Sequence, residues 1–138
     1  MIAYLDPSVV LRLVLGEPDR LSEWEALSGA VASALTEVEC LRTLDRLARA
    51  GVLQAEDLAD RRTAVYQLLE GVEVVDVGRP ILRRASGPFP TPLGTLDAIH
   101  LASAMAWREA RSQELLMATH DRGLGTAARA MGFRVAGL

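Results

Sequence analysis

A short apolar segment at the N-terminus runs directly into an Asp-Pro pair, and this junction restricts the possible folds more than any other feature. Residues 2–5 are apolar, Asp6 follows, and helical spacing of apolar residues begins at Pro7. A buried strand that feeds a helix is typical of a parallel sheet built from βαβ units. Such sheets bind ligands beyond the carboxyl ends of their strands. We therefore expect Asp6 to lie at a ligand-binding edge.

The alternation of strands and helices continues along the chain. We predict strands at residues 30–34, 72–77, 115–118 and 133–135, and helices at residues 36–50, 55–70, 79–86, 95–110 and 122–131. A further helix is predicted around Leu21, Trp24 and Leu27, which are spaced to share one face. Residues 86–94 contain three alternating prolines and are predicted to form a loop. This pattern predicts a single α/β domain over residues 1–138, with three layers and a mostly parallel sheet.

The composition indicates a folded protein of the cytoplasm. Half of the 138 residues are hydrophobic and 24% are charged, which excludes a disordered chain. No apolar run approaches the roughly 18 residues that a membrane span requires. The N-terminus lacks a basic start followed by a long apolar segment, so we expect no signal peptide. The single cysteine, Cys40, cannot form an intramolecular disulfide.

The charge distribution argues against a broad basic surface for nucleic acid. The formal net charge is −3, and all 15 positive side chains are arginine. The absence of lysine is typical of GC-rich coding, although arginine also makes the better bidentate contact with phosphate. Local contacts between arginine and phosphate are compatible with both explanations.

Four acids lie where predicted helices begin: Asp6, Glu39, Asp97 and Asp121. Each has a structural explanation. Asp6 and Asp121 fit helix N-caps, and Glu39 fits a capping box with Thr36. Asp97 would complement the dipole of its helix, although that helix is apolar on nearly every side, so its carboxylate should be partly buried and need a partner.

The predicted topology gives these acids a second explanation. Helices that follow strands in a parallel sheet begin at the same edge, so the four carboxylates could converge in one crevice. Carboxylates held close together repel one another unless protons or cations neutralise them. Oxygen ligands without a Cys or His cluster favour Mg²⁺ or Mn²⁺. Nucleases use such ions to activate water and to stabilise the leaving oxygen.

These segments together resemble the PIN-domain ribonucleases, in particular the VapC-type toxins of toxin–antitoxin pairs. The matching segments are Leu5-Asp6-Pro7-Ser8, residues 33–39 with Arg42 three positions later, residues 95–104, and Thr119-His120-Asp121. Their order and spacing cover nearly the whole chain. One departure is Pro7, where threonine is frequent in the family.

The resemblance implies a three-layer α/β/α fold with strand order 3-2-1-4-5. It also implies Mg²⁺- or Mn²⁺-dependent RNA hydrolysis, a homodimer, and inhibition by a cognate antitoxin. It assigns the four acids to the metal site and the catalytic reaction. By the same comparison, Ser8 is the small hydroxyl residue after the first acid, Thr119 is a polar neighbour of the last, and Arg42 supports the site, where it could contact RNA phosphate.

One choice stays open between Glu37 and Glu39. In a helical projection Glu37 falls within the apolar face of the helix at residues 36–50, and a misplaced acid of this kind is often functional. The family spacing, with the acid three positions after Thr36, favours Glu39. We follow the spacing.

The remaining candidates have simpler interpretations. We expect His100 to be a packed residue or a neighbour of the site, and His120 to be a solvated loop residue. The alternative function is a non-catalytic doubly wound binding or regulatory domain whose acids only cap helices. A phosphoaspartate enzyme with Asp6 as nucleophile is disfavoured because there is no lysine to bind phosphate and position 8 is serine.

Overall fold

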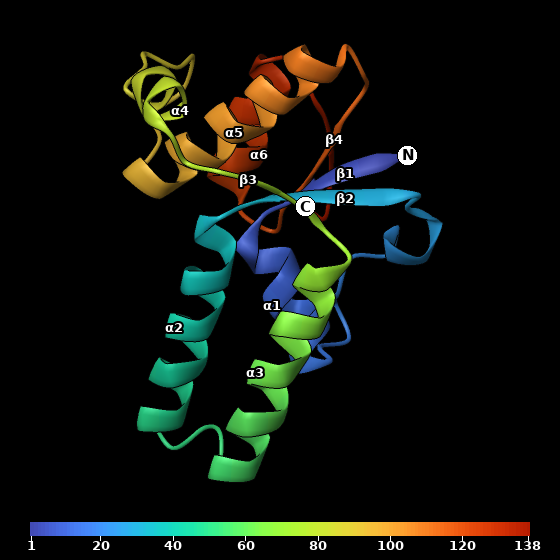
Figure 1. The fold of residues 1–138 in the computed structure, drawn as a ribbon, viewed down its shortest axis with the longest axis vertical. Helices are drawn as coiled ribbons and strands as arrows, with labels where there is room; N and C mark the ends of the chain where they lie inside the picture. Colours follow the sequence, from blue (N-terminus) through green and yellow to red (C-terminus); the bar gives the residue numbers. More distant parts are fainter.

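The computed structural model describes residues 1–138, and its centre is a parallel sheet of five strands (Figure 1). The strands are β1 (Ile2–Leu5), β2 (Gly29–Ser33), β3 (Glu73–Val75), β4 (Leu116–Ala118) and β5 (Arg134–Ala136). Their order in the sheet is β3-β2-β1-β4-β5, and each neighbouring pair is parallel. The predicted order is confirmed, and β1 is the central strand.

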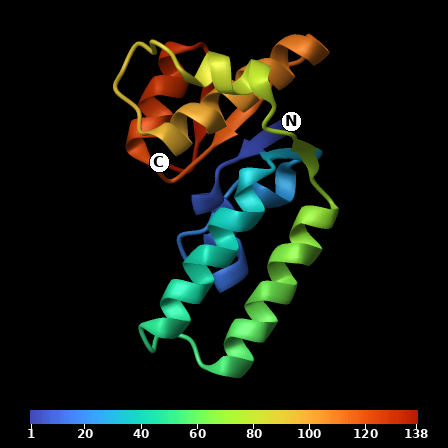
Figure 2. The ribbon, with the colours of Figure 1, turned by 60° about the vertical axis from the view of Figure 1, so that its left-hand side comes forward.

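Six helices cover the two faces of this sheet. They are α1 (Pro7–Leu15), α2 (Leu35–Arg49), α3 (Ala55–Glu70), α4 (Arg79–Ala85), α5 (Thr95–Arg111) and α6 (Arg122–Ala130). Figures 1 and 2 show α1, α2 and α3 on one side of the sheet and α4, α5 and α6 on the other. The three-layer architecture is therefore confirmed. None of these helices is both long enough and apolar enough to cross a membrane.

Alternation along β1 divides the core into two parts. Ala3 and Leu5 pack into the cluster shared with α1, α2 and α3, whereas Tyr4 points into the cluster shared with α5 and α6. All three side chains are completely buried. Burial of an apolar side chain such as Leu5 contributes about 1.5–3 kcal/mol. A strand buried on both faces explains why residues 2–5 carry no charged side chain and are aliphatic apart from Tyr4.

The helix predicted around Leu21, Trp24 and Leu27 is wrong, because only a 3₁₀ turn forms at Trp24–Ala26. Leu21 alone among the three is fully packed in the core. The segment must then return to the sheet, where the Ser28 N–H donates to the Met1 carbonyl at 3.0 Å. So short a segment cannot offset the cost of helix nucleation while its end is held extended.

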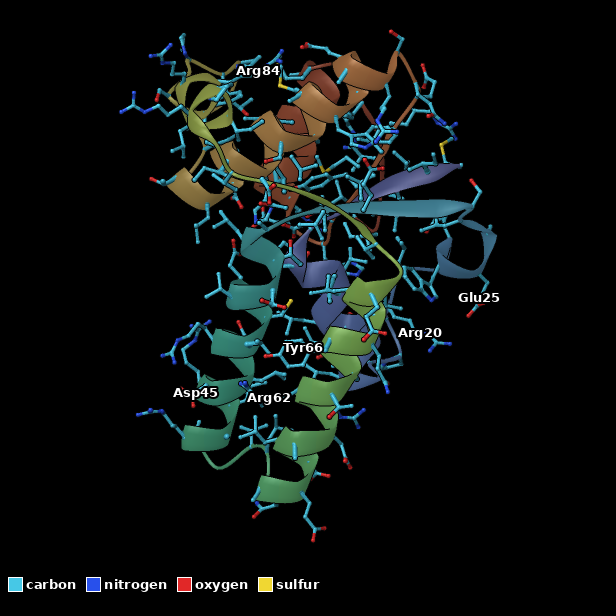
Figure 3. The ribbon with its side chains drawn as sticks, in the orientation of Figure 1. Arg20, Glu25, Asp45, Arg62, Tyr66 and Arg84 are labelled. Atoms are coloured by element: carbon cyan, nitrogen blue, oxygen red, sulfur yellow. The ribbon has the colours of Figure 1, made fainter.

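Charged side chains of this segment point outward. Figure 3 shows Arg20 and Glu25 directed away from the body of the molecule. The same view labels Arg84, whose guanidinium donates to both Glu109 oxygens, at 2.6 and 2.5 Å, and so joins α4 to α5.

The predicted capping box at the start of α2 does not form. The N-cap is Ala34, which makes no side-chain capping bond, and Thr36 lies inside the helix. The Thr36 hydroxyl is buried without a hydrogen-bond partner. Ser33 replaces it, because its Oγ accepts from the Leu35 N–H at 3.1 Å. Glu39 is consequently not used at the helix terminus.

Candidate active site

The site lies at the carboxyl edge of the sheet, where β1 and β4 end side by side. The Asp6 N–H donates to the Ala118 carbonyl at 3.0 Å, so the residues that follow the two strands meet at this edge. These residues are Asp6 and Ser8 after β1, and Thr119 and Asp121 after β4. The parallel pairing of β1 with β4 thus brings together side chains more than 100 positions apart.

Asp6 is held through one of its two carboxylate oxygens. Oδ2 accepts from the Ser8 N–H at 3.3 Å, from the Ser8 hydroxyl, and from the Thr119 hydroxyl at 3.0 Å. Oδ1 accepts no hydrogen bond. Asp6 is only 6% exposed, and burial raises the pKa of its carboxyl group although these hydrogen bonds and the proximity of His100 lower it. Asp6 also caps α1, as predicted.

Asp121 is tied to the same network through its backbone. Its N–H donates to Thr119 Oγ1 at 3.0 Å, and the His120 N–H donates to Ser8 Oγ at 3.0 Å. The Asp121 side chain caps α6, because Oδ1 accepts from the Leu124 N–H at 2.9 Å. The predicted cap is confirmed, and the second oxygen of Asp121 accepts no hydrogen bond.

The expectation that His120 is solvated is wrong. Its Nδ1 donates to the Gly137 carbonyl at 2.6 Å, and its Nε2 is buried without a partner. His120 therefore joins the segment after β4 to the segment after β5.

Glu39 reaches the site from α2 through a buried histidine. His100 Nε2 and Glu39 Oε1 are 2.8 Å apart, and His100 Nδ1 is 2.8 Å from the Tyr4 hydroxyl. His100 is 1% exposed, which confirms the prediction of a packed neighbour of the site. Tyr4 is not among the site residues predicted from the sequence. Its signal is a phenol in an otherwise aliphatic strand, because a buried Tyr hydroxyl usually needs a partner.

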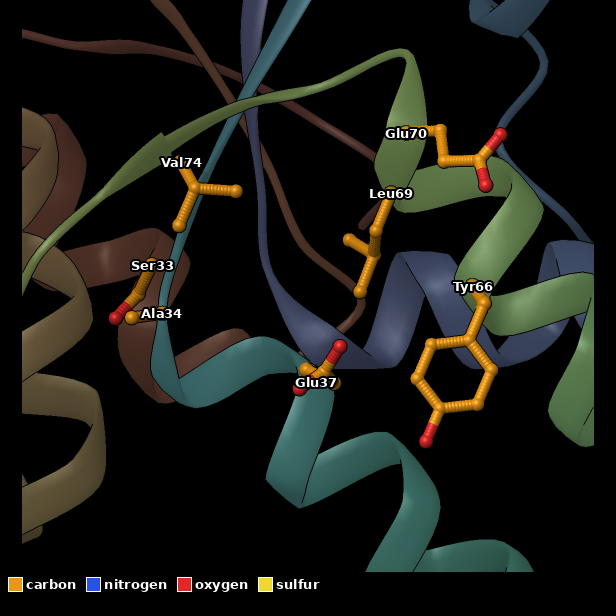
Figure 4. A pocket seen from close by; sticks show the side chains of 7 residues that line it. All are labelled: Ser33, Ala34, Glu37, Tyr66, Leu69, Glu70 and Val74. Carbon is orange, nitrogen blue, oxygen red and sulfur yellow. The ribbon is translucent and has the colours of Figure 1, made fainter.

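Glu37 lies elsewhere. It is exposed, and it lines a pocket of about 360 Å³ that also contains Tyr66 and Glu70 of α3 (Figure 4). Positions two apart on a helix are separated by about 200°, so Glu37 and Glu39 cannot face the same edge. The apolar face that includes Glu37 is directed toward α3, which explains why the helical projection pointed to the wrong acid for this crevice.

Asp97 occupies the first turn of α5, and its carboxylate makes no hydrogen bond. The N-cap of this helix is Gly94, so Thr95 does not cap it. Burial raises the pKa of Asp97, and the negative charges of Asp121, Asp6 and Glu39 raise it further, while His100 lowers it. The four predicted acids therefore share one electrostatic environment.

The site has few compensating positive charges. No arginine forms an ion pair with Asp6, Asp97 or Asp121, and Glu39 is paired only with His100. A set of carboxylate oxygens fits Mg²⁺ or Mn²⁺ in its chemistry. In the structure as it stands, no group of three or more acid, His or Cys side chains is arranged closely enough to hold an ion.

Arginines line a second pocket beside Glu39. This pocket has a volume of about 360 Å³ and is lined by Val38, Glu39, Arg42, Thr43, Arg46 and Leu96. Arg42 forms an ion pair with Asp45 at 3.1 Å, whereas Arg46 donates only to the Thr43 hydroxyl at 2.9 Å. The sequence analysis did not single out Arg46, which lies one turn beyond Arg42.

Comparison with known proteins identifies the fold and the family. The PIN domain family model matches residues 3–130. The ribonuclease VapC47 of Mycobacterium tuberculosis is 31% identical over 137 aligned positions, which cover 94% of this chain and 92% of that protein. A second ribonuclease of that species, VapC46, is also 31% identical, over 96% of this chain and 94% of its own length.

Solved structures share the architecture. A toxin–antitoxin complex from Klebsiella pneumoniae contains a chain with a TM-score of 0.63 and 18% identity, covering 86% of each chain. At these identities the likeness concerns the fold. The matches to the family model and to the two ribonucleases extend over nearly the whole sequence. The chain therefore belongs to the PIN domain family and, within it, to the VapC-type proteins.

Proposed function

We propose that this protein is a divalent-metal-dependent endoribonuclease toxin, that residues 1–138 act as one PIN domain in the cytoplasm, and that Mg²⁺ or Mn²⁺ is its cofactor. Support comes from the family, whose relatives in Mycobacterium tuberculosis are named ribonucleases, and from the acidic edge described above.

The electrostatics of Asp97 carry the proposal. Its carboxylate is partly buried, has no hydrogen-bond donor, and lies in the field of Asp121, Asp6 and Glu39, without an arginine to compensate. Such an arrangement costs stability in the metal-free protein. Capping accounts for Asp6 and Asp121, but it accounts for neither Asp97 nor Glu39. The alternative of acids that only cap helices therefore leaves half of the set unexplained.

The four acids would form the metal site. Asp97, Glu39 and the free oxygens of Asp6 and Asp121 would hold the ion. A bound divalent ion supplies an activated hydroxide and neutralises the phosphate charge during in-line hydrolysis. Ser8 and Thr119 would act on Asp6, because their hydroxyl groups occupy its Oδ2 and leave Oδ1 without a hydrogen bond.

Binding of RNA needs a positive contact close to an acidic site. Arg42 and Arg46 beside Glu39 would provide it, since guanidinium groups bind phosphate in a bidentate manner. A local pair of arginines agrees with a chain of net charge −3.

We further propose a cognate antitoxin and a homodimer. The antitoxin is suggested by the Klebsiella pneumoniae toxin–antitoxin complex, which shares this fold. The homodimer is suggested only by the family.

The test compares Asp97→Asn with Glu37→Gln in RNA cleavage with Mg²⁺, Mn²⁺ or EDTA. Both changes remove one negative charge, but Glu37 faces the other pocket. We expect Asp97→Asn to reduce cleavage about 100-fold or more, because metal catalysis contributes several kcal/mol. Glu37→Gln should retain the wild-type rate. Cleavage by Asp97→Asn at the wild-type rate, or full activity in EDTA, would show the proposal to be wrong.

Thermal unfolding provides a second measurement. Mn²⁺ at about 100 times its Kd should stabilise the wild-type fold by about 2.7 kcal/mol, and the gain should shrink in Asp97→Asn but not in Glu37→Gln. An equal gain in both variants would contradict a site at Asp97.

A further inference from the structure

We propose that His100 is a positioning residue and that, together with Tyr4, it forms a buried relay which fixes the orientation of the Glu39 carboxylate. The relay runs from the Tyr4 hydroxyl to His100 Nδ1 and from His100 Nε2 to Glu39 Oε1, with both separations 2.8 Å. It connects three elements: β1, α5 and α2.

Burial makes the relay rigid. Tyr4 is completely buried and His100 is 1% exposed, whereas the Glu39 side chain is 22% exposed. The rings of Tyr4 and His100 pack edge to face, with centroids 6.0 Å apart and an interplanar angle of 68°. Only the last member therefore reaches the crevice. A glutamate side chain on a helix has three rotatable bonds and can adopt many rotamers. The hydrogen bond with His100 therefore decides where the Glu39 carboxylate lies.

The direction of each hydrogen bond in the relay follows from the chemistry of its two end groups, the Tyr4 hydroxyl and the Glu39 carboxylate. Burial and the charge of Asp6 raise the pKa of Tyr4, so its oxygen keeps its proton and can donate to Nδ1. A neutral imidazole that accepts at Nδ1 carries its proton on Nε2. That proton points at a carboxylate, which can only accept. Each donor then has an acceptor.

The other arrangement leaves a conflict. The Ser103 hydroxyl is an alternative acceptor for Tyr4, although in the structure it forms no hydrogen bond with Tyr4 and donates to the Ile99 carbonyl at 2.7 Å. If Tyr4 donated to Ser103, His100 would place its proton on Nδ1, and a bare Nε2 would face a carboxylate oxygen at 2.8 Å. Two acceptors at this distance repel each other, and a buried unpaired polar atom costs about 1–3 kcal/mol. The tautomer with the proton on Nε2 avoids that cost.

The consequence for activity rests on the proposed function, because it treats Glu39 as a metal ligand. Hydrogen-bond partners that orient metal ligands typically change metal affinity by about 10- to 100-fold when they are removed. His100 touches the carboxylate and not the ion, so its effect should be on the geometry of binding.

The first experiment needs neither metal nor RNA. Nitrogen NMR of the metal-free protein distinguishes a protonated ring nitrogen from a bare one. We expect His100 with a proton on Nε2 and a bare Nδ1 in the wild type, and a changed tautomer population in Tyr4→Phe, which removes only the hydroxyl. A bare Nε2 overturns the relay.

The second experiment uses matched substitutions. His100→Gln can place an amide N–H near the position of Nε2, whereas His100→Leu fills similar space without a donor. We expect His100→Leu to weaken Mn²⁺ binding in calorimetry by about 10-fold or more, and His100→Gln to recover most of the loss. Tyr4→Phe, which preserves the packing, should give an intermediate loss even if His100→Leu fails to fold.

The outcomes separate the two proposals. If the wild type neither binds Mn²⁺ nor cleaves RNA, the proposed function fails while the tautomer measurement still decides the relay. If the wild type binds the ion and both His100→Leu and Tyr4→Phe bind it equally well, the relay is wrong and the proposed function stands.

Discussion

The Thr119 hydroxyl donates to Asp6 Oδ2 at 3.0 Å and thereby joins two residues that are 113 positions apart in the chain. The Thr119 hydroxyl oxygen also accepts from the Asp121 N–H at 3.0 Å. Thr119 is completely buried. The Thr119 hydroxyl thus links the ends of β1 and β4 to the start of α6 through hydrogen bonds.

Thr119→Val should destabilise the protein by about 1–3 kcal/mol, because the isosteric change removes the buried hydrogen bond to the Asp6 carboxylate and the acceptor of the Asp121 N–H. It should also raise the pKa of Asp6 further, since the Thr119 hydrogen bond lowers it. Urea unfolding measures the first effect. Thr126→Val is the control: Thr126 is exposed on α6 and donates only within its helix, so it should change stability by less than about 0.5 kcal/mol. Equal losses in the two variants would argue against this role.

The raised pKa values of Asp6 and Asp97 predict how the metal-free protein responds to pH. Both lie above 3.8 in the folded state, so the fold retains protons that the unfolded chain has released. The stability contributed by this difference is present below the unfolded pKa and is lost as pH rises through the folded pKa. At neutral pH Asp97→Asn should therefore be at least as stable as the wild type in EDTA.

Urea unfolding between about pH 4 and about pH 8 tests this linkage. The advantage of Asp97→Asn should shrink as pH falls, because the wild-type carboxyl group becomes protonated. Adding Mg²⁺ at neutral pH should remove most of the advantage by stabilising the wild type alone. A difference that is constant across the pH range would contradict the assigned coupling.

Gly137 should tolerate no side chain. Its φ is +97°, and a Cβ there would lie 2.6 Å from the Thr119 carbonyl oxygen. Gly137→Ala should cost about 1–3 kcal/mol or more. Gly125→Ala is the contrast, because its Cβ would meet Leu138 Cδ1, also at 2.6 Å, but at the end of a flexible, half-exposed side chain. Because alanine has a higher helix propensity than glycine, Gly125→Ala should leave the free energy of unfolding unchanged or raise it by up to about 1 kcal/mol.

Arg46→Gln should weaken RNA binding without reducing the catalytic step. The expected result is a raised KM, an unchanged kcat, and a salt dependence of binding reduced by about one released counterion. Arg62→Gln on α3, outside the pocket beside Glu39, is the matched control (Figure 3). Equal salt slopes in wild type and Arg46→Gln would exclude this contact with phosphate.

Much of the architecture was predictable because local pattern and topology agree. Apolar strands feeding helices specify a parallel sheet, and the helix that follows residues 2–5 begins at Pro7, with Asp6 as its N-cap, as expected. The segment around Leu21 failed because apolar spacing describes a face, not whether a short stretch can nucleate a helix between two fixed ends. The capping box failed because α2 begins at Leu35, one residue earlier than predicted, so that Thr36 lies inside the helix and Ser33 accepts from the Leu35 N–H.

The arrangement of the site could be predicted less completely. Helical spacing could not decide between Glu37 and Glu39, since the direction toward the sheet edge is a tertiary property. The contact between Tyr4 and His100 spans 96 positions, and that between His100 and Glu39 spans 61. No periodicity encodes such pairs. A buried Tyr and a buried His on facing elements are the only signals that the sequence carries.

The unequal use of the two Asp6 oxygens has a consequence for how this fold can lose its activity. One oxygen joins the end of the central strand to the residue after its neighbour β4, so replacement of Asp6 would damage the scaffold together with the proposed metal site. Asp97 forms no such bond. In relatives that have lost the proposed activity but still fold, we therefore expect Asp97 to be substituted before Asp6.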